Sequence, residues 1–393
     1  MMEAKMSQHS KQELVQRLQP RYLKADRKEK TKILDEFVAV TGLHRKAAIR
    51  RLRQQNGAKS ERRGRQKTYT GGVVSALVTI WRICGCICGK RLQPILSDMV
   101  DSLERHNELK VDEETKGLLL EVSSATIDRL LRPFKVGKRR GQSTTKPGGL
   151  LKHQIPVRTF ADWDDTQAGF VEIDLVAHCG DSVAGQFLYS FTATDVATGW
   201  TECFSLRHRS QIAVQQALDQ LQKRLPFPLL GIDSDNDSVF INELILKYCQ
   251  TNSITFTRCR PYQKNDQCFV EQKNWSIVRR TIGYQRYESQ AAQQLLAEIY
   301  EVLHLYTNLF QPTFKLRSKK RTGAKVYKTY DTPQTPLQRV LDMKLLSADN
   351  ISLWQAAYRD TNPAALRRRI DRKIRQLVQL GKYIPLWQRL PLR

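Results

Sequence analysis

Three acidic residues of this 393-residue chain stand in contexts that suit metal-dependent chemistry. Asp174 lies inside the apolar run VEIDLV, Asp235 follows the apolar run LLGI, and Glu271 comes 36 positions after Asp235. A carboxylate in such a run is seldom left unpaired, and converging carboxylates repel one another unless cations compensate. Oxygen ligands without His or Cys favour Mg²⁺ or Mn²⁺. Two such ions, roughly 3.5–4 Å apart, can support in-line phosphoryl transfer.

Hydrophobic periodicity predicts the elements that would position these residues. Three runs between residues 169 and 207, rich in β-branched and aromatic residues, predict a three-stranded antiparallel meander. Helix, strand, helix and strand patterns follow, and then a helix that starts near Asn265. This order predicts an α/β domain with a mixed sheet. If the first and fourth strands are neighbours, Asp174 and Asp235 meet at one sheet edge, and the last helix can lay Glu271 across them.

Two motifs around these residues resemble those of a known family. DSDNDSVF resembles the (S/T)-D-N-G-x-x-F motif, and RPYQKNDQCFVEQKN resembles the motif in which a proline precedes V-E-x-x-N, in transposases and integrases of the DDE superfamily. The 35 residues between Asp235 and Glu271 are similar to the spacing in retroviral integrases. LYTNLFQP at 305–312 resembles an element of the insertion-sequence transposase branch.

The resemblance implies a ribonuclease-H-like fold in which Asp174, Asp235 and Glu271 are the catalytic residues and bind two Mg²⁺ or Mn²⁺ ions. It implies a DNA transposase that hydrolyses transposon ends and joins the freed 3′-hydroxyl to target DNA. Water and then the 3′-hydroxyl are the nucleophiles, so no protein nucleophile is needed. The expected partners are double-stranded transposon ends, target DNA and further copies of the chain in a homo-multimeric synaptic complex.

Several positions depart from the family pattern. Asp237 stands where the motif has glycine, and Val239 where an acidic residue is common. Asp tolerates turn geometry better than most residues, although its charge could perturb ion binding. Val278 stands where many relatives carry a basic residue, while helical periodicity puts Arg279 and Arg280 on another face. The alternative function is therefore a catalytically inactive, sequence-specific DNA-binding protein derived from a transposase.

Three neighbouring residues have two interpretations each. Asp233 points to the same side of its strand as Asp235 and is interpreted as a turn or cap residue, with support of the metal ligands as the alternative. Asp266 is interpreted as a helix N-cap rather than a metal ligand. Asn274, one turn after Glu271, could steady the glutamate or contact DNA.

Charge is distributed unevenly along the chain, whose net charge is +26. Residues 1–70 carry 19 Lys and Arg against 7 Asp and Glu, and residues 313–393 carry 19 against 5. Residues 161–285 carry 11 against 15. Two basic flanks around an acidic centre predict arms that hold nucleic acid and a middle that collects cations. A Gly-rich loop ending in Gly-Lys-Ser/Thr is absent, so no nucleotide cofactor is expected.

The first part of the chain predicts DNA-binding helices. Residues 31–54 follow a helix, glycine turn, helix pattern with Arg and Lys on the outer face of the second helix, as in a helix-turn-helix; an ordinary helical hairpin is the alternative. SSATIDRLL at 123–131 predicts the last helix of a second such unit. The expected DNA contacts are Arg45, Lys46, Arg50, Arg51, Arg62, Arg63, Arg65, Lys67, Thr126, Arg129, Lys264, Lys273, Asn274, Arg279, Lys319, Lys320 and Arg321.

The pattern changes predict an α/β core with all-α domains before it and a small basic region after it. The expected segments are a helix-turn-helix domain (1–55), a basic linker (56–69), a second helical domain (70–134), a basic linker (135–160), the catalytic core (161–312), a basic β module that binds DNA (313–345) and a helical tail (346–393). Arginines in that tail suggest either a surface helix or a contact between protomers.

Targeting and redox signals are few. No apolar stretch reaches the roughly 20 residues of a membrane span and no signal peptide is recognised, so we expect no membrane partner and a cytoplasmic, nucleoid-associated location if the source is bacterial. The cysteines of CGCIC at 84–88 lack further ligands at zinc spacing and are interpreted as core thiols.

Overall fold

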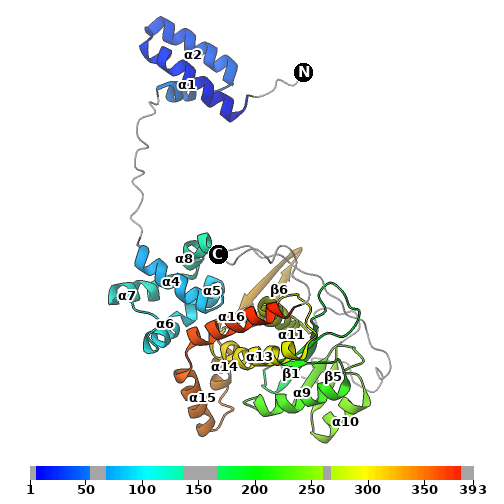
Figure 1. Cartoon of the computed structure of the whole chain (residues 1–393). Helices are drawn as coiled ribbons and strands as arrows, with labels where there is room; N and C mark the ends of the chain where they lie inside the picture. The colour runs from blue at the N-terminus through cyan, green and yellow to red at the C-terminus, as the bar shows by residue number, and fades with distance from the viewer. Residues whose placement is uncertain (1–5, 54–67, 136–165, 260–266, 382–393) are drawn as a thin grey trace. The chain divides into compact units, whose positions relative to one another are not determined.

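The computed structural model describes residues 6–53, 68–135, 166–259 and 267–381. It divides into two compact units, Met1–Thr68 and Tyr69–Arg393, each of which is described by itself (Figure 1). Several sequence predictions lie outside the described residues, namely Arg62, Arg63, Arg65, Lys67, Lys264, Asp266 and most of the two basic linkers. No helix in the described ranges is long and apolar enough to cross a membrane.

The first unit packs α1 (Gln8–Lys24), α2 (Arg27–Thr41) and α3 (Arg45–Arg53) around a small apolar core. Ile33, Phe37 and Leu52 are fully buried in it. Gly42 ends α2 with a positive φ of 63°, and its N–H donates to the carbonyl of Val38 at 2.9 Å. This left-handed residue lets the chain turn between α2 and α3, since glycine has no Cβ to clash there.

A five-stranded mixed sheet lies at the centre of the second unit. Its strands are β1 (Phe170–Ala177), β2 (Tyr189–Asp195), β3 (Thr201–Leu206), β4 (Gly231–Ser234) and β5 (Thr255–Arg258), in the order β3-β2-β1-β4-β5. The first three pair antiparallel, whereas β4 pairs parallel to both β1 and β5. The predicted meander, mixed sheet and ribonuclease-H-like fold are thereby confirmed, and the condition that the first and fourth strands are neighbours is met.

Helices cover both faces of this sheet. Helices α9 (Gln211–Arg224) and α10 (Glu243–Thr251) share an apolar core with alternate residues of the strands, including Val171 and Ile173 of β1. The opposite face is covered by α11 (Cys268–Lys273), the π-helix η3 (Asn274–Arg279), α12 (Arg280–Ile282) and α13 (Gln290–Phe310). Because side chains alternate along a strand, Glu172 and Asp174 face this second layer.

The remaining helices of the second unit pack against α13 and the sheet. Before the sheet come α4 (Gly71–Ile83), α5 (Gly89–Leu92), η1 (Gln93–Ile95), α6 (Leu96–Arg105), α7 (Glu113–Glu121), α8 (Ser124–Leu131) and η2 (Arg132–Phe134). After it come α14 (Pro336–Asp342), α15 (Ala348–Asp360) and α16 (Pro363–Gln379). One apolar core joins α4 to α8 with Trp200, Phe310 and Leu337. Residues 71–134 are thus packed into the second unit.

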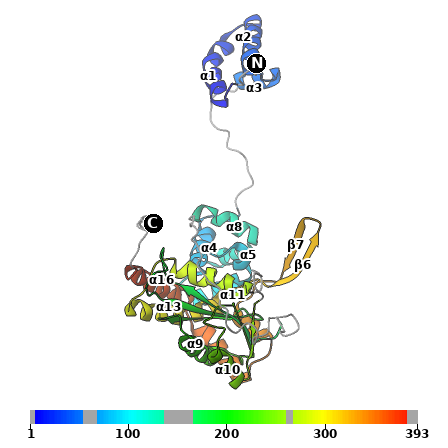
Figure 2. The same ribbon diagram turned by 90° about the vertical axis from the view of Figure 1, so that its right-hand side faces the viewer.

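A hairpin of β6 (Leu316–Thr322) and β7 (Lys325–Tyr330) projects from the second unit (Figure 2). Every residue of β7 is exposed, so the hairpin has no buried face of its own. Among the cysteines interpreted as core thiols, Cys84 is buried, but Cys86 and Cys88 are exposed. That interpretation was wrong for these two because α4 ends at Ile83 and the chain turns there, with a positive φ of 59° at Cys86.

Candidate active site

Asp174 and Asp235 meet where β1 and β4 run side by side. The two strands are parallel with Ile173 opposite Ser234, so the next residue along each chain is one of the two aspartates. Asp174 accepts a hydrogen bond from the N–H of Leu175 at 2.7 Å, and Asp235 accepts one from the N–H of Asp237 at 3.0 Å. Both side chains are half-buried at the end of β4, where open α/β sheets place their ligands.

The two aspartates raise the free energy of each other's charged form. Burial, followed by the charges of Asp235 and Glu271, raises the pKa of Asp174 to about 8, against hydrogen bonds that lower it. Burial also raises the pKa of Asp235 to about 6, and the charge of Asp237 adds to this while Arg209 opposes it. A bound divalent cation would reverse this balance, because it favours the ionised carboxylates.

Glu271 lies on α11, and its side chain is exposed. The start of α11 is held by Glu172 of β1, which is fully buried and accepts hydrogen bonds from the N–H groups of Phe269 and Val270, each at 2.9 Å. A carboxylate at a helix N-terminus satisfies otherwise unpaired donors. Glu172 therefore ties the helix of Glu271 to the strand of Asp174. Our sequence analysis missed this residue, although a buried acid two positions before Asp174 was visible in VEIDLV.

Asn274 joins the helix layer directly to Asp174. Its side-chain N–H donates to Asp174 Oδ2 at 2.6 Å, so it steadies this aspartate. Asn274 also starts the π-helix η3. Such wider turns occur frequently at functional sites.

The π-helix changes the positions of the residues that follow it. The expectation that Arg279 lies on a different face from Glu271 assumed a regular α-helix, and η3 breaks that period. Arg279 donates to the carbonyl of Ala177 at 2.8 Å, lies 4.9 Å from the ring centre of Tyr284, and interacts electrostatically with Asp174. Val278 is fully buried. The first basic side chain after Glu271 to interact with the site from this helix is therefore Arg279.

Asp237, which replaces the glycine of the motif, forms an ion pair with Arg209. It is not among the residues with positive φ, so the substitution causes no left-handed strain. Its Oδ1 also accepts from the N–H of Val239 at 3.0 Å, and Val239 is buried among α9 and α10 side chains. The extra acidic charge is thus paired, and the buried Val239 helps anchor the turn after Asp235.

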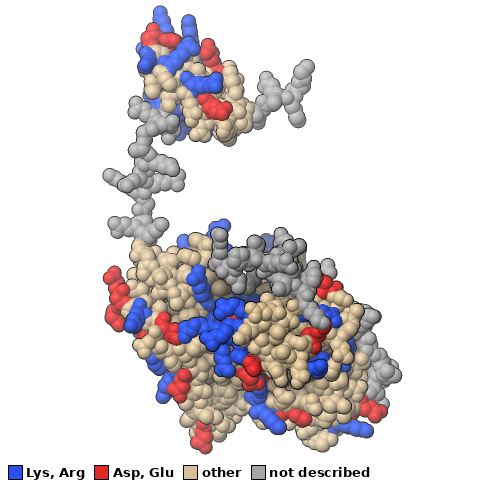
Figure 3. All heavy atoms as spheres, in the orientation of Figure 1, with Lys and Arg blue, Asp and Glu red and all other residues tan. Residues whose placement is uncertain are grey.

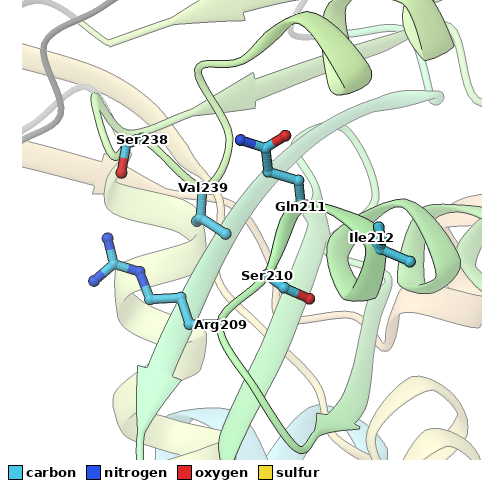
Figure 4. A pocket seen from close by; sticks show the side chains of 6 residues that line it. All are labelled: Arg209, Ser210, Gln211, Ile212, Ser238 and Val239. Carbon is cyan, nitrogen blue, oxygen red and sulfur yellow. The ribbon is translucent and has the colours of Figure 1, made fainter.

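A hollow of about 690 Å³ lies beside this ion pair, lined by Arg209, Ser210, Gln211, Ile212, Ser238 and Val239. Arg209 and Ser238 lie on one side of it and Ile212 on the other (Figure 4). Arg209 comes from the loop before α9, 28 residues before Asp237. Sequence spacing gave no signal for this pairing.

Other polar residues fix the ends of β4 and β5. Asp233 is fully buried, and its Oδ1 accepts from Thr257 Oγ1 at 2.7 Å. The side chain of Asn236 donates to the carbonyl of Cys259 at 3.0 Å and accepts from Arg258 at 3.1 Å. These bonds hold the turn that carries Asp235 against the neighbouring strand.

Lys273 is placed differently from the sequence expectation. It is only 6% exposed and donates to the carbonyl of Gly199 at 3.2 Å, while burial, with the charge of Arg91, lowers its pKa to about 7. This burial argues against the predicted DNA contact. The physical reason is helix geometry, since Lys273 faces the sheet while Glu271 and Gln272 face outward.

The remaining expected DNA contacts lie away from the carboxylates in the sequence. In the first unit Arg45 pairs with Asp35, and Arg45, Lys46 and Arg50 are exposed. On α8, Arg129 donates to Thr126 Oγ1 at 2.8 Å. Lys320 is exposed on β6, the strand that also carries Lys319 and Arg321. None of these is part of the sheet edge.

Within the described ranges no three His, Cys, Asp or Glu residues form a ready-made metal cluster. Asp174 and Asp235 nevertheless supply adjacent oxygen donors whose pKa values are raised first by burial and then by neighbouring carboxylates. The donor set therefore fits a hard divalent cation better than a soft one.

The chain is similar to a sequence family, a curated relative and a solved structure. The sequence model of the family described as Integrase core domain matches residues 165–264, a range that includes Asp174 and Asp235 and ends before Glu271. The chain is 45% identical over 339 residues to the uncharacterized protein y4rM of Sinorhizobium fredii strain NGR234, which spans 86% of this chain and 97% of the relative. The catalytic core domain of BIV integrase is a structural match at 19% identity, with a TM-score of 0.30, covering 45% of this chain and 97% of that one.

Proposed function

The chain belongs to the DDE superfamily of transposases and integrases, and we propose that it is a DNA transposase. The proposed reactions are hydrolysis at the ends of a transposon and joining of the freed 3′-hydroxyl to target DNA. Water attacks a phosphodiester in the first reaction, and the 3′-hydroxyl attacks one in the second. Hydrolysis breaks one phosphodiester and leaves a phosphomonoester and a free 3′-hydroxyl. Joining breaks one phosphodiester of the target and forms one between the target and the transposon end. In both reactions the attacking oxygen loses a proton and the leaving oxygen takes one up.

In this proposal Asp174, Asp235 and Glu271 hold two Mg²⁺ or Mn²⁺ ions. When bound, such ions activate an attacking oxygen and stabilise the leaving one. The protein's own contribution is to fix the carboxylates. Asn274 orients Asp174, the N–H of Asp237 orients Asp235, and Glu172 anchors the helix of Glu271.

The ion pair of Arg209 and Asp237 has a supporting part in the proposal. Asp237 lies two residues from Asp235, and an unpaired charge there would compete for the cations or distort the turn. Arg209 neutralises the carboxylate of Asp237, and the N–H of Asp237 donates a hydrogen bond to Asp235. The departure from the glycine of the motif is then compatible with activity.

We propose that the DNA is held by Thr126 and by basic side chains on several segments. Helices α3 and α8 and the hairpin β6–β7 supply Arg45, Lys46, Arg50, Arg51, Thr126, Arg129, Lys319, Lys320 and Arg321, while Arg62, Arg63, Arg65, Lys67 and Lys264 come from the other basic segments. Arg368, Arg369, Arg372 and Arg375 of α16 are also exposed, and basic side chains gather over this helix in Figure 3. Their contacts with phosphates would be sensitive to salt. Synapsis of two ends would require a homo-multimer.

The single observation that carries this proposal is the meeting of Asp174 and Asp235 at one sheet edge, with the helix of Glu271 tied to the same strand. The test is a strand-transfer assay with duplexes taken from the inverted repeats that flank the gene, in Mg²⁺ and in Mn²⁺. We expect nicked ends and joined products. A protein that binds these duplexes but neither nicks nor joins them in either metal contradicts the proposal.

That negative result would favour the second candidate, a DNA-binding protein that retains the fold without the activity. The observation in its favour is the replacement of the motif's glycine by Asp237 and of the common acidic residue by Val239, which is buried. The DNA beside the gene distinguishes the two, because an active element is flanked by inverted repeats and a short target duplication.

A further inference from the structure

Trp275 is exposed next to the candidate active site. It is 59% exposed, whereas Trp81 and Trp200 are 4% and 0% exposed and Trp354 packs edge-on against Trp200. Among the described residues it is the one tryptophan left outside a core, and no hydrogen bond or ring contact is seen for it there. An exposed indole is a large apolar surface that a soluble fold gains nothing by presenting to water.

The position of Trp275 connects it to the carboxylates. It follows Glu271 by four residues, about one helical turn. Both side chains are exposed while Lys273 between them is buried, so Glu271 and Trp275 lie on the outward side of this helix. The residue before it, Asn274, donates to Asp174 at 2.6 Å. Both residues belong to the first turn of the π-helix η3. The indole thus flanks the group of three acids on the outward side.

The chemistry at this site determines which ligand group the indole can contact. When a phosphodiester reaches Asp174 and Asp235, the two nucleotides that it joins lie within about one helical turn of Glu271. Bases inside a duplex are stacked on each other and cannot stack on a side chain, whereas unpaired bases stack readily on aromatic rings. The acids that surround the site also make it unsuitable for an acidic peptide, while the strongly basic chain favours a nucleic acid.

We propose that Trp275 is a stacking platform for an unpaired nucleobase at the DNA end whose phosphodiester reacts. This inference rests on the proposed function for its substrate. It adds a binding site for one base, beside the sites for phosphate and metal. It further means that the end is unpaired over at least one nucleotide when it enters the site.

The test uses the full chain and duplexes of the flanking inverted repeat, with 2-aminopurine placed either in the terminal nucleotide or in the interior. Binding is followed by fluorescence without divalent metal, so that no cutting occurs. We expect wild type to change the fluorescence of the terminal probe, Trp275→Ala to lose this change, and Trp275→Phe to retain most of it. Loss of one stacked base should weaken end binding by about 5- to 100-fold.

Leu353→Ala is the matched control, since Leu353 is 64% exposed on α15. It should behave as wild type, and all variants should keep the wild-type melting temperature. Equal terminal signals from wild type and Trp275→Ala overturn the proposal, as does equal loss in Trp275→Ala and Leu353→Ala. Because the readout needs no reaction, a wild type that shows the terminal signal but never joins DNA contradicts the proposed transposase activity and leaves the base site standing.

Discussion

The sheet edge and the hairpin β6–β7 carry opposite charges in opposite environments. At the edge, acidic groups are half-buried, and Asp174, Asp235 and Asp237 each have a named hydrogen-bond partner in the fold. Residues 313–330 carry seven Lys and Arg and no acid, and β7 is exposed throughout. The first region is organised by the interior of the protein before any ligand arrives.

Contacts at its base anchor the hairpin to the second unit. There the N–H of Lys315 donates to Asp331 at 2.7 Å, Asp331 pairs with Arg339 at 2.7 Å, and the rings of Phe314 and Tyr330 lie 5.7 Å apart. A two-stranded hairpin without an apolar face is marginally stable in water. The comparison teaches that the fold holds the acidic groups of the sheet edge in fixed positions, whereas the hairpin presents exposed positive charges. Mutations should therefore affect reaction chemistry at the edge and salt-dependent binding at the hairpin.

The largest effect is expected for Asp235→Asn. Loss of this carboxylate would remove a proposed metal ligand, and we expect strand transfer to fall by about a thousand-fold or more, as for the loss of an essential catalytic group. Binding of the end duplex, measured by fluorescence anisotropy, should stay within a few-fold of wild type. Glu243→Gln, a change to an exposed acid on α10, is the control and should leave both unchanged. Appreciable joining of DNA by the Asp235→Asn variant would contradict the proposed catalytic role of this aspartate.

Glu172→Gln should affect both stability and activity. A buried carboxylate that accepts from two N–H groups is replaced by an amide, and a hydrogen bond to a charged group is worth about 1.5–3 kcal/mol. We expect a similar loss of unfolding free energy in chemical denaturation. Activity should fall by about 10- to 100-fold even where the protein is fully folded, since α11 positions Glu271. A variant that loses stability but not activity would separate Glu172 from the site.

The hairpin should respond in the opposite way. Changing Lys320, Lys325 and Lys328 together to Ala removes three charges from exposed strands. The melting temperature should not move, but the slope of log affinity against log salt concentration should fall by about 0.9 for each lost phosphate contact. Charge-retaining Arg substitutions at the same positions are the control. If the salt slope is unchanged, the hairpin does not contact DNA.

A smaller effect is expected for the ion pair at the edge. Arg209→Ala leaves Asp237 unpaired, so joining should fall by several-fold, and Asp237→Gly in the same protein should restore it. We expect a coupling energy of about 0.5–1.5 kcal/mol, discounted because Arg209 is about one-third exposed. The double-mutant cycle is measured in joining rate and in melting temperature. Additive losses without rescue would mean that the two residues act independently.

The smallest and most general prediction concerns pH. The pKa values of Asp174 and Asp235 are raised from 3.8 to about 8 and about 6, so the folded, metal-free protein binds these protons more tightly than the unfolded chain. Its stability should therefore fall as pH rises from about 4 to 8. A divalent cation must displace the same protons, so the rise in melting temperature on adding Mg²⁺ should grow over that range. Asp235→Asn should reduce both trends, and the hairpin variant should show both unchanged.

The sequence by itself determined the antiparallel meander and the mixed sheet. Both follow from local periodicity and element order, since alternation marks strands and the order of elements restricts their connections. The adjacency of the first and fourth strands was only a condition in the sequence argument, and the tertiary structure supplied it. The motifs around Asp174, Asp235 and Glu271 likewise gave the superfamily, because order and spacing along the chain are linear information. The apolar stripes of α2 and α3 were readable for the same reason.

Only the tertiary structure decided how the residues around the acids are used. Pairings such as Arg209 with Asp237 and Glu172 with the start of α11 join residues that are far apart in sequence, and no local period specifies them. Lys273 and Trp275 lie two residues apart, yet one is buried and the other exposed, because helix packing chooses the face. At η3 even the helical period changed, which brought Arg279 to the site in place of Val278.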